Sequence, residues 1–388
     1  MSQRRVPQLD GIRGLAILLV IYWHYVAAPN VLEASGTLGR ALFRVGMLTW
    51  SGVDLFFVLS GFLIGGILID AKDSRRYFQT FYIRRSFRIL PLYVSLCWIG
   101  TAIVMLRPAW GGVLGHPMPF WIYLTFTQNF WLAHHSWNAY MGVTWSLAVE
   151  EQFYLTLPLV IRFVSMRWLP ITVGALVLTS IVGRSLLYLH YGNDWGTAAY
   201  VLMFCRADAL MLGVLGALAI RTPRVLGVLS ERRWILYLAI GTSGSAVGAL
   251  LLKGWTMQTR PMSTLGYSCV AFFYLSLLLL AVIRADGWWA KGLRSRPLIK
   301  CGNLAYCLYM VHGMTFSVSS YWLHRRVHVS GPDFSAAIVG LLGALGISQL
   351  SWRYFESKMI RIGHRFSYSE FAARAETDVS STVGASAS

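Results

Sequence analysis

Residues 52–69 read GVDLFFVLSGFLIGGILI, a run whose single charged side chain is that of Asp54. With Trp50 and Ser51, the apolar segment covers residues 50–69. A helix needs about 20 mostly apolar residues to cross roughly 30 Å of hydrocarbon, so this segment has the length and composition of one membrane crossing. The fold class therefore depends on how many such segments the chain contains.

Nine further stretches come close to the same requirement, and we expect about ten transmembrane helices in all. They cover residues 12–28, 89–106, 148–164, 168–190, 198–220, 234–252, 264–283, 302–323 and 335–352. An eleventh apolar stretch, residues 120–131, is shorter and carries Gln128 and Asn129. We predict that it is a re-entrant or interfacial segment. The predicted fold class is an all-α, polytopic membrane protein.

The composition agrees with this class. The 388 residues are 56% hydrophobic and 13% charged, with a mean hydropathy of +0.55. Soluble proteins carry about 25% charged residues, so the outer face of this chain is expected to meet lipid. A net charge of +18 would suggest a nucleic-acid partner in a soluble protein. Here the basic residues lie between apolar stretches, and we expect no nucleic-acid partner.

The basic residues also indicate how the chain is threaded, because Lys and Arg are retained in cytoplasmic loops. With the N-terminus inside and ten alternating crossings, the inner segments hold most of the 34 Lys and Arg residues. We therefore expect both termini in the cytoplasm and a membrane domain over residues 1–360. Residues 361–388 would form a cytoplasmic tail that is disordered at its end, where residues 375–388 are small and polar.

The first crossing contains two ionisable residues, each costing about 2.5–3.5 kcal/mol at the centre of a membrane helix. Arg13 and His24 are eleven positions apart, which places them on one stripe of a regular helix, about 16 Å apart along its axis. Arg13 could bind an anion at the inner mouth while His24 moves a proton deep in the membrane. The alternatives are a snorkelling cation and a histidine packed between helices.

A second group of ionisable residues lies in TWSLAVEEQFY, residues 144–154, where a crossing starts from the outside. Ser146 and Glu150 share a helix face, whereas Glu151 points about 100° away. A carboxylate at this level could orient an imidazole that acts as a base. The alternative is that the two glutamates only stabilise the N-terminus of the helix.

The segment from Lys72 to Arg88 is densely basic, and its last part, RRSFR from Arg84, continues into a predicted helix. Such density suits a phosphate-rich ligand on the cytoplasmic side, although topology alone would also explain it. Arg206 and Asp208 lie within the sixth crossing, two residues apart. They must find partners on other helices and are candidates for lining a cavity.

Taken in order, six motifs resemble those of the acyltransferase-3 family of integral-membrane acyltransferases. They are LDGIRGLA (9–16) running on to His24, GVDLFFVLSGFLI (52–64), FYIRRSFRILPLY (81–93), TWSLAVEEQFY (144–154), RADAL (206–210) and GNLAYCLYMVH (302–312). The resemblance covers residues 7 to about 360.

The resemblance implies a ten-helix domain of the bacterial inner membrane. Such a domain takes an acyl group, usually acetyl, from cytoplasmic acyl-CoA and passes it to a hydroxyl of an acceptor, commonly a sugar of an exported polysaccharide. The positions that match the family's motifs are His24 with Arg13, Ser146 with Glu150, and Arg85 with Arg88. Some members carry an extra hydrolase-like domain after the membrane part; since this chain ends in a short polar tail, we expect the membrane domain and its outer loops to handle the acceptor.

The resulting hypothesis has His24 as the base that removes a proton from the acceptor hydroxyl. Glu150 orients His24 or stabilises its charged form, and Ser146 belongs to the same catalytic group. His24 and Arg13 would then face one tunnel through the membrane. The residues expected to hold CoA phosphates are Arg13, Arg84, Arg85 and Arg88, and those expected to contact substrate are Trp145, Asn129, Arg206 and Asp208. The expected partners are the lipid bilayer, acetyl-CoA or another acyl-CoA as co-substrate, and a carbohydrate, with no metal.

Other functions stay open. In a secondary transporter or polysaccharide exporter, the same buried ionisable residues would relay protons or bind cargo, but we find no two related halves in the sequence. Within the family, the acceptor could be a small secondary metabolite such as a macrolide. Direct attack on the thioester and an acyl-enzyme relay are both compatible with the sequence.

Overall fold

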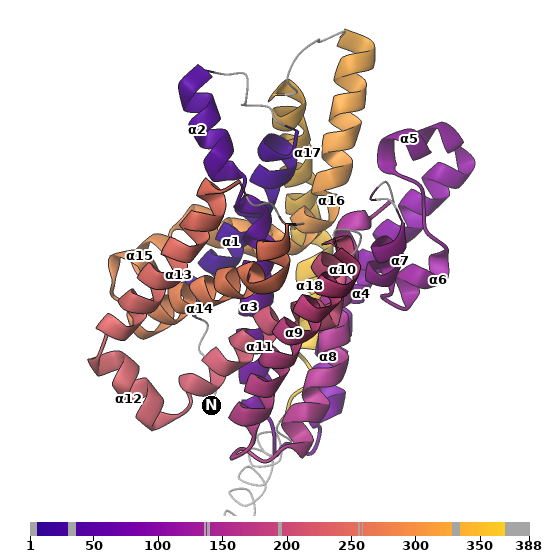
Figure 1. The fold of residues 1–388 in the computed structure, drawn as a ribbon. Helices are drawn as coiled ribbons and strands as arrows, with labels where there is room; N and C mark the ends of the chain where they lie inside the picture. The colour runs from indigo at the N-terminus through magenta and orange to yellow at the C-terminus, as the bar shows by residue number, and fades with distance from the viewer. Residues whose placement is uncertain are drawn as a thin grey trace, which may run out of the picture.

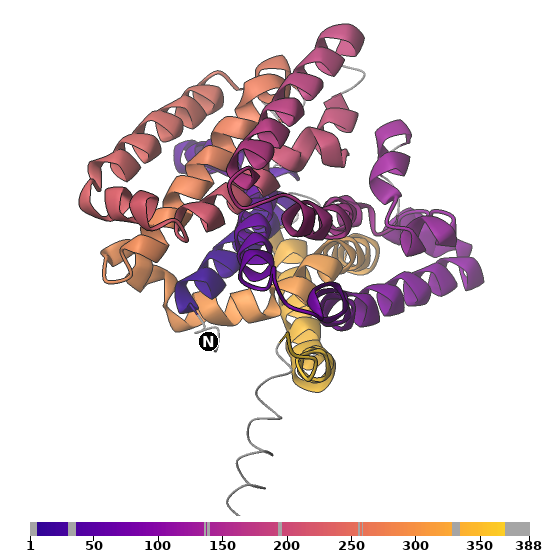
Figure 2. The same ribbon diagram turned by 90° about the horizontal axis from the view of Figure 1, so that it is seen from below.

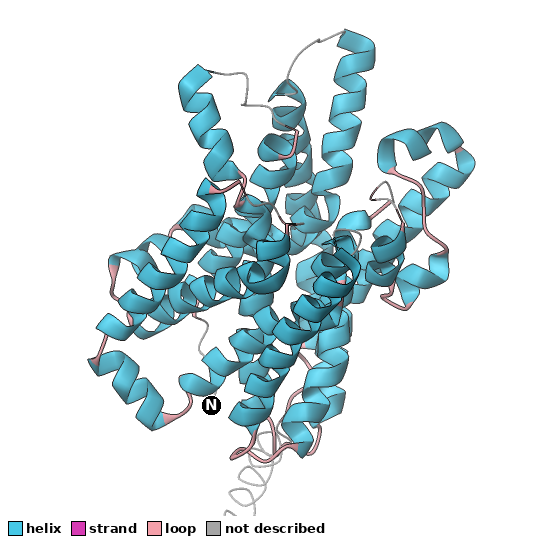
Figure 3. Ribbon diagram, viewed as in Figure 1, coloured by secondary structure: helices cyan, strands magenta, loops and turns pink. Residues whose placement is uncertain are grey.

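The computed structural model describes residues 6–29, 36–135, 137, 140–192, 196–254, 257, 259–327 and 334–368, and within them it contains helices and no β-strand (Figures 1 and 3). Ten long helices of this part are α1 (Pro7–Tyr22), α3 (Gly52–Asp70), α4 (Tyr77–Leu106), α8 (Trp145–Phe163), α9 (Leu169–Tyr191), α11 (Met203–Ala219), α13 (Trp234–Leu252), α14 (Tyr267–Ile283), α16 (Arg296–Val327) and α17 (Phe334–Ser351). Shorter helices are α2 (Gly36–Gly46), α5 (Gly111–Leu114), α6 (Phe120–Leu124), α7 (Gln128–His134), α10 (Gly196–Val201), α12 (Pro223–Glu231), α15 (Trp288–Leu293) and α18 (Ser357–Gly363).

Each predicted crossing corresponds to one of the ten long helices, and the all-α, polytopic class is confirmed. Among the described residues, eight helical segments are long and apolar enough to cross a membrane; α8 and α16 are not among them. The reason for α8 is its charge, since it carries Glu150, Glu151 and Arg162. In α16 the apolar run is interrupted by polar side chains such as His312. Residues of both helices line the candidate site.

The stretch at residues 120–131 forms two short helices, α6 and α7, and neither is long enough to cross a membrane. The chain turns between them with Phe126 in the left-handed region at φ 53°. Gln128, which is fully buried, donates to the hydroxyl of Tyr93 at 3.2 Å and to the carbonyl of Thr144 at 3.1 Å. The segment is therefore folded back against α4 and the start of α8, as a re-entrant segment would be.

The centre of the bundle is formed by α1 and α3, which the other long helices surround (Figure 2). The contact of α1 with α16 depends on two glycines. A side chain at Gly14 would overlap the carbonyl of Leu298, and one at Gly302 would overlap the carbonyl of Asp10. The two backbones therefore touch directly, which places side chains of α1 and α16 close together.

Segments predicted to be cytoplasmic meet at one end of the molecule. Lys72 donates to the carbonyl of Val164, and Arg162 donates to the carbonyl of Lys72. Asp70 pairs with Arg221 at 2.6 Å. In Figure 1 the N-terminus and α12 lie at the lower end, whereas α2 lies at the upper end. Three of the segments predicted to be cytoplasmic are thus in contact, and the threading itself stays a prediction.

The beginning of the predicted tail packs on the membrane domain. Ser74 donates to the carbonyl of Tyr368 at 2.6 Å, and Thr80 donates to that of Ser367 at 3.1 Å. Residues 361–368 therefore cover the start of α4. The stretch expected to be disordered, residues 375–388, lies outside the described residues.

Candidate functional site

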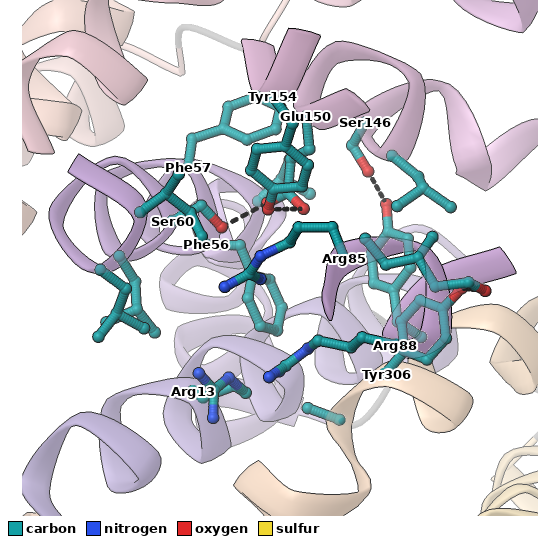
Figure 4. A pocket seen from close by; sticks show the side chains of 18 of the residues that line it. Arg13, Phe56, Phe57, Ser60, Arg85, Arg88, Ser146, Glu150, Tyr154 and Tyr306 are labelled. Atoms are coloured by element: carbon teal, nitrogen blue, oxygen red, sulfur yellow. Dashed lines mark hydrogen bonds between the residues drawn. The ribbon is translucent and has the colours of Figure 1, made fainter. Parts of the chain in front are cut away.

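Helices α1, α3, α4, α8 and α16 enclose a cavity of about 300 Å³, which we call the arginine cavity (Figure 4). Its polar lining residues are Arg13, Ser60, Arg85, Arg88, Ser146, Glu150, Tyr154, Tyr306, Tyr309 and His364. The remaining lining is mostly aliphatic and phenylalanine side chains from α3, together with Ile89, Leu147, Ala305 and Met310. The cavity thus combines a charged part with an apolar part.

Three guanidinium groups point into the arginine cavity, those of Arg13, Arg85 and Arg88 (Figure 4). Arg13 is paired with Asp10 at 3.0 Å, and Arg85 lies over the ring of Tyr154 at 5.6 Å. Like charges held this close repel one another, so a bound polyanion would relieve the repulsion. The sequence prediction that these three residues act together agrees with their placement.

His364, which follows α18, also lines the arginine cavity. Burial lowers the pKa of His364, and repulsion by Arg84, Arg88 and Arg85 lowers it further. The side chain is therefore expected to be neutral at pH 7, when the cavity is empty.

Glu150 is the acidic group of the arginine cavity. Its carboxylate accepts hydrogen bonds from Ser60 at 2.7 Å and from Tyr154 at 3.2 Å (Figure 4). These two donors fix the carboxylate at the wall formed by α3 and α8.

A second cavity of about 240 Å³ has a different character, and we call it the aromatic chamber. It is lined by Val20, Trp23, His24, Trp50, Val53, Trp137, Val143, Trp145, Tyr200, Met257 and Tyr309. Six of these side chains are Trp or Tyr, and none is acidic. Such walls stack against apolar faces of a ligand, while their N–H and O–H groups give polar contacts at the edges.

His24 lies in the turn Trp23–Ala27, which is π-helical. The amide of Ala28 donates to the carbonyl of Trp23 at 2.8 Å, five residues back. Such wider turns often occur at functional sites. His24 Nδ1 lies 2.9 Å from the carbonyl oxygen of Val20. Because a carbonyl can only accept, Nδ1 carries the hydrogen and Nε2 is left to take up a proton.

The two cavities share Val53 and Tyr309, which we call the shared wall. The Tyr309 hydroxyl lies 2.5 Å from that of Ser146 and donates to the carbonyl of Val143 at 2.8 Å. The sequence predicts one tunnel joining Arg13 to His24; in the structure these two residues line two neighbouring cavities that have the shared wall in common. Arg13 lies in one and His24 in the other.

One predicted contact is not found among the described hydrogen bonds. Glu150 lines the arginine cavity and is bound by Ser60 and Tyr154, whereas His24 lines the aromatic chamber and bonds to the Val20 carbonyl. The ring of His24 instead contacts that of His312, at 4.7 Å between ring centroids. Helical spacing fixes the face on which Glu150 lies, but not the neighbouring helix that this face meets.

Arg84 and Asn129 lie away from both cavities. Arg84 donates to the carbonyl of Phe366 at 2.8 Å and lies over the ring of Tyr368, so it holds the segment after α18. Asn129 is buried and exchanges two amide hydrogen bonds with Gln152, at 3.0 and 3.2 Å, which join α7 to α8. Binding roles for these two residues stay predictions that neither placement supports.

Arg206 and Asp208 are fully buried in ion pairs, and neither lines the two cavities. Arg206 pairs with Asp54 of α3, and Asp208 pairs with Arg184 of α9 at 3.1 Å. The prediction that both need partners on other helices is confirmed, whereas cavity lining is not found.

Trp145 lines the aromatic chamber, as its predicted substrate contact requires. Its ring lies 4.6 Å from that of Tyr200, which the Arg206 guanidinium approaches from behind at 5.3 Å. Arg206 therefore supports the chamber wall.

Sequence reasoning missed several residues of the site. Tyr309 and His312 lie within a quoted motif, but we assigned no chemistry to them. A histidine in an apolar run was the signal that singled out His24, and the same signal applies to His312. The tryptophans of the chamber come from separate segments, and no local pattern joins them.

The family model described as "Acyltransferase domain" matches residues 6–353 of the chain. "O-acetyltransferase OatA" of Staphylococcus aureus (strain NCTC 8325 / PS 47) is 28% identical over 378 residues, which cover 94% of this chain and 58% of that protein. "Peptidoglycan O-acetyltransferase OatA" of Listeria monocytogenes is 27% identical over 382 residues, covering 93% of this chain and 57% of that protein. The chain thus spans a little over half the length of these curated relatives. No solved structure matches.

Proposed function

Since this chain belongs to the acyltransferase-3 family of acyltransferase domains, we propose that it is a membrane-embedded O-acyltransferase. It moves an acyl group, in the simplest case acetyl, from cytoplasmic acyl-CoA to a hydroxyl of a carbohydrate, either an exported polysaccharide or its lipid-linked precursor. The relatives named as O-acetyltransferases support the acetyl group, and the one named for peptidoglycan supports a glycan acceptor. In this proposal the protein lies in the bacterial inner membrane with both termini in the cytoplasm.

The observation that carries the proposal is the pair of cavities with opposite chemistry that meet at the shared wall. One is lined by three arginines, and the other by aromatic rings and a histidine with a free Nε2. A two-substrate transfer across a membrane needs a site of this kind, with an anionic donor on one side and a polar, ring-shaped acceptor on the other.

The donor fits the arginine cavity by charge and size. CoA carries phosphates, which guanidinium groups bind in a bidentate manner. A cavity of about 300 Å³ is at the lower end of the range for drug-sized ligands. It is therefore suited to the acyl-pantetheine arm, with the phosphates held by Arg13, Arg85 and Arg88.

The acceptor fits the aromatic chamber. At about 240 Å³ the chamber is smaller than sites for drug-sized ligands, so it suits a single sugar ring better than a macrolide. Ring faces of Trp145 and Tyr200 would stack on the apolar face of the sugar, leaving one hydroxyl toward His24.

His24 then acts as the base. Its Nε2 takes the proton of the acceptor hydroxyl while the oxygen forms a bond to the thioester carbonyl carbon. When the C–S bond breaks, the CoA thiolate leaves and receives that proton from His24. The acyl group passes the shared wall, either directly or on an acyl-enzyme. Rotation of the Tyr309 side chain would open the wall for this step.

The test uses the purified full chain in lipid nanodiscs with radiolabelled acetyl-CoA. Peptidoglycan fragments, a lipid-linked sugar and a macrolide are offered separately as acceptors. We expect free CoA and labelled glycan in equal amounts, and mass spectrometry should find one added acetyl group per modified sugar. A transporter would release no free CoA. Acetylation of the macrolide alone would show that the acceptor is a small metabolite and not a carbohydrate.

Two histidine variants complete the test. His24→Ala should abolish transfer while leaving insertion and CoA binding intact, because the arginine cavity is unaffected. His190→Ala is the matched control, since His190 is exposed on α9. Acyl transfer by His24→Ala at the rate of the control would remove His24 from the mechanism.

A further inference from the structure

We propose that His312 is a positioning residue of the aromatic chamber, and that its neutral imidazole stabilises His24 while His24 carries the proton. This inference rests on the proposed function, in which His24 is the base. It gives α16 a role in the reaction, namely to stabilise the positive charge on His24, for which a carboxylate is the more usual partner.

Among the residues that the structure describes, no carboxylate lies beside His24 to balance its charge. No acidic side chain lines the aromatic chamber, and Glu150 is held in the other cavity by Ser60 and Tyr154. The Val20 carbonyl fixes the tautomer of His24 but carries no charge. An imidazolium in water-poor surroundings is costly unless another group stabilises it, so the reaction needs a further partner.

His312 is placed to be that partner. It is fully buried, and the centroids of the His312 and His24 rings lie 4.7 Å apart with an interplanar angle of 66°. In this edge-to-face arrangement the electron-rich face of one ring meets the edge of the other. The attraction grows when one ring becomes a cation.

The hydrogen bonds of His312 leave one nitrogen free. Its Nδ1 lies 2.7 Å from the carbonyl oxygen of Tyr309, so Nδ1 carries the hydrogen. Its Nε2 is buried and has no hydrogen-bond partner among the described residues. A buried, unpaired ring nitrogen is costly, and electrostatic attraction between the neutral His312 ring and a charged His24 would account for the cost.

In the described part of the chain, α2 and α17 also pack against the turn that holds His24. Their charged side chains are Arg40 and Arg44 of α2, and both are exposed. The π-helical turn of α1 contributes His24 and Tyr25, whose hydroxyl donates to the His312 carbonyl at 2.8 Å. On α16 itself the polar neighbours are Tyr309, with its ring at 5.6 Å, and Thr315, whose hydroxyl donates to the His312 carbonyl at 3.0 Å. From the side of α8, Gly313 meets Val143, which is apolar.

The proton count is unchanged by this role. The acceptor proton moves to His24 Nε2, the acceptor oxygen binds the acyl carbon, and the C–S bond of the thioester breaks. The thiolate then takes the proton from His24. His312 is neutral before and after the step.

The test compares two substitutions that keep different nitrogens. His312→Asn keeps an amide near the position of Nδ1, and His312→Gln keeps one near the position of Nε2. We expect kcat to fall about 10-fold or more in His312→Asn, as for loss of other orienting partners, while the KM for acetyl-CoA stays within about twofold. His312→Gln should retain several times more activity than His312→Asn. The acidic limb of the pH–rate profile should move to lower pH in His312→Asn only.

His324→Asn is the matched control. His324 lies on the same helix and makes the same backbone contact, with Nδ1 2.8 Å from the Ser320 carbonyl oxygen, but it is exposed. We expect this variant to behave as the unmodified protein. Equal losses in His312→Asn and His312→Gln, with an unmoved pH profile, would show that His312 only packs the core and would overturn the inference.

NMR of nanodisc samples with isotope-labelled histidine separates this inference from the proposed function. The pH at which His24 becomes protonated should be lower in His312→Asn than in the unmodified protein. If the unmodified protein transfers no acyl group, the proposed function fails, while this titration still reports whether the two rings are coupled. An identical His24 titration in both proteins would overturn the inference.

Discussion

The hydroxyl oxygens of Tyr309 and Ser146 lie 2.5 Å apart, at the point where α16 meets α8. Tyr309 has one hydroxyl hydrogen and gives it to the Val143 carbonyl, so Ser146 is the donor to Tyr309. Ser146 lines the arginine cavity, while Tyr309 lines both cavities. The contact therefore holds Tyr309 in the shared wall from the side where the donor would bind.

Tyr309→Phe removes both hydrogen bonds of this wall and keeps the ring. Each such bond contributes about 1 kcal/mol, so we expect the wall to open more often. Water should then reach the donor, and CoA release should exceed glycan acetylation. Tyr306→Phe is the control, since Tyr306 loses a single hydrogen bond to the Ile89 carbonyl and lines only the arginine cavity. The ratio of free CoA to labelled glycan decides the prediction, and equal ratios in the two variants contradict it.

Arg88→Gln should weaken donor binding. A charge-assisted hydrogen bond contributes about 1.5–3 kcal/mol, so we expect the KM for acetyl-CoA to rise at least 10-fold. The neighbouring Arg84 is a matched control, because it is bound to Phe366 and Tyr368 outside the cavity. Arg84→Gln should change this KM by less than about threefold. A larger rise of this KM in Arg84→Gln than in Arg88→Gln would instead support the predicted contact of Arg84 with the CoA phosphates.

Donor binding should be accompanied by proton uptake at His364. Its pKa is lowered by burial and by Arg84, Arg88 and Arg85. A bound polyanion offsets those charges and raises this pKa again, so the bound state holds more protons. Affinity for CoA should therefore increase as the pH falls below neutrality. Calorimetry in two buffers of different ionisation enthalpy measures the uptake. His364→Asn should show a smaller proton uptake. The phosphates of CoA titrate equally with both proteins, so the difference between them measures the share of His364.

Asp54→Asn should destabilise the fold, because it leaves the buried Arg206 unpaired. Breaking a buried pair costs about 3–5 kcal/mol. Removing both charges, with Asp54→Asn and Arg206→Gln together, should recover part of the loss. Asp70→Asn breaks the more exposed pair with Arg221 and should cost less than about 1 kcal/mol. Thermal unfolding in detergent ranks the variants; lost activity with unchanged stability would instead support a substrate role for Arg206.

Gly14→Ala should loosen the contact between α1 and α16. The new methyl group would overlap the Leu298 carbonyl, and overpacking of this kind costs about 1–3 kcal/mol. Gly174→Ala has the same chemistry in α9, where nothing lies within 4 Å. There the better helix propensity of Ala should stabilise the protein by up to about 1 kcal/mol. Opposite shifts of the unfolding temperature are expected, and equal shifts would contradict the assignment of direct backbone contact.

The helices could be predicted because apolar length is a local property of the sequence. Each predicted crossing has its helix, and the break in residues 120–131 was marked by Gln128 and Asn129. The need of Arg206 and Asp208 for partners on other helices could also be predicted locally, since two residues that are two positions apart on a regular helix cannot face each other.

The sequence predicted which residues belong to the site better than it predicted which of them touch one another. Arg13, Arg85, Arg88, Ser146 and Glu150 do line one cavity, and His24 lines the next. Which helix lies opposite each face is a tertiary property, and for that reason the predicted pairing of Glu150 with His24 does not appear among the hydrogen bonds of either residue. Helical spacing also assumes a regular helix, whereas His24 lies in a π-helical turn that changes the register of the residues after it.

The shared wall has a consequence for the cell in which the proposed enzyme works. An inner membrane holds a voltage, worth about 2.3 kcal/mol per elementary charge for each 100 mV. If water fills both cavities, much of that voltage falls across the residues between them, Val53 and Tyr309 among them. These side chains would then help to limit proton leakage, and selection on them would concern energy conservation as much as chemistry.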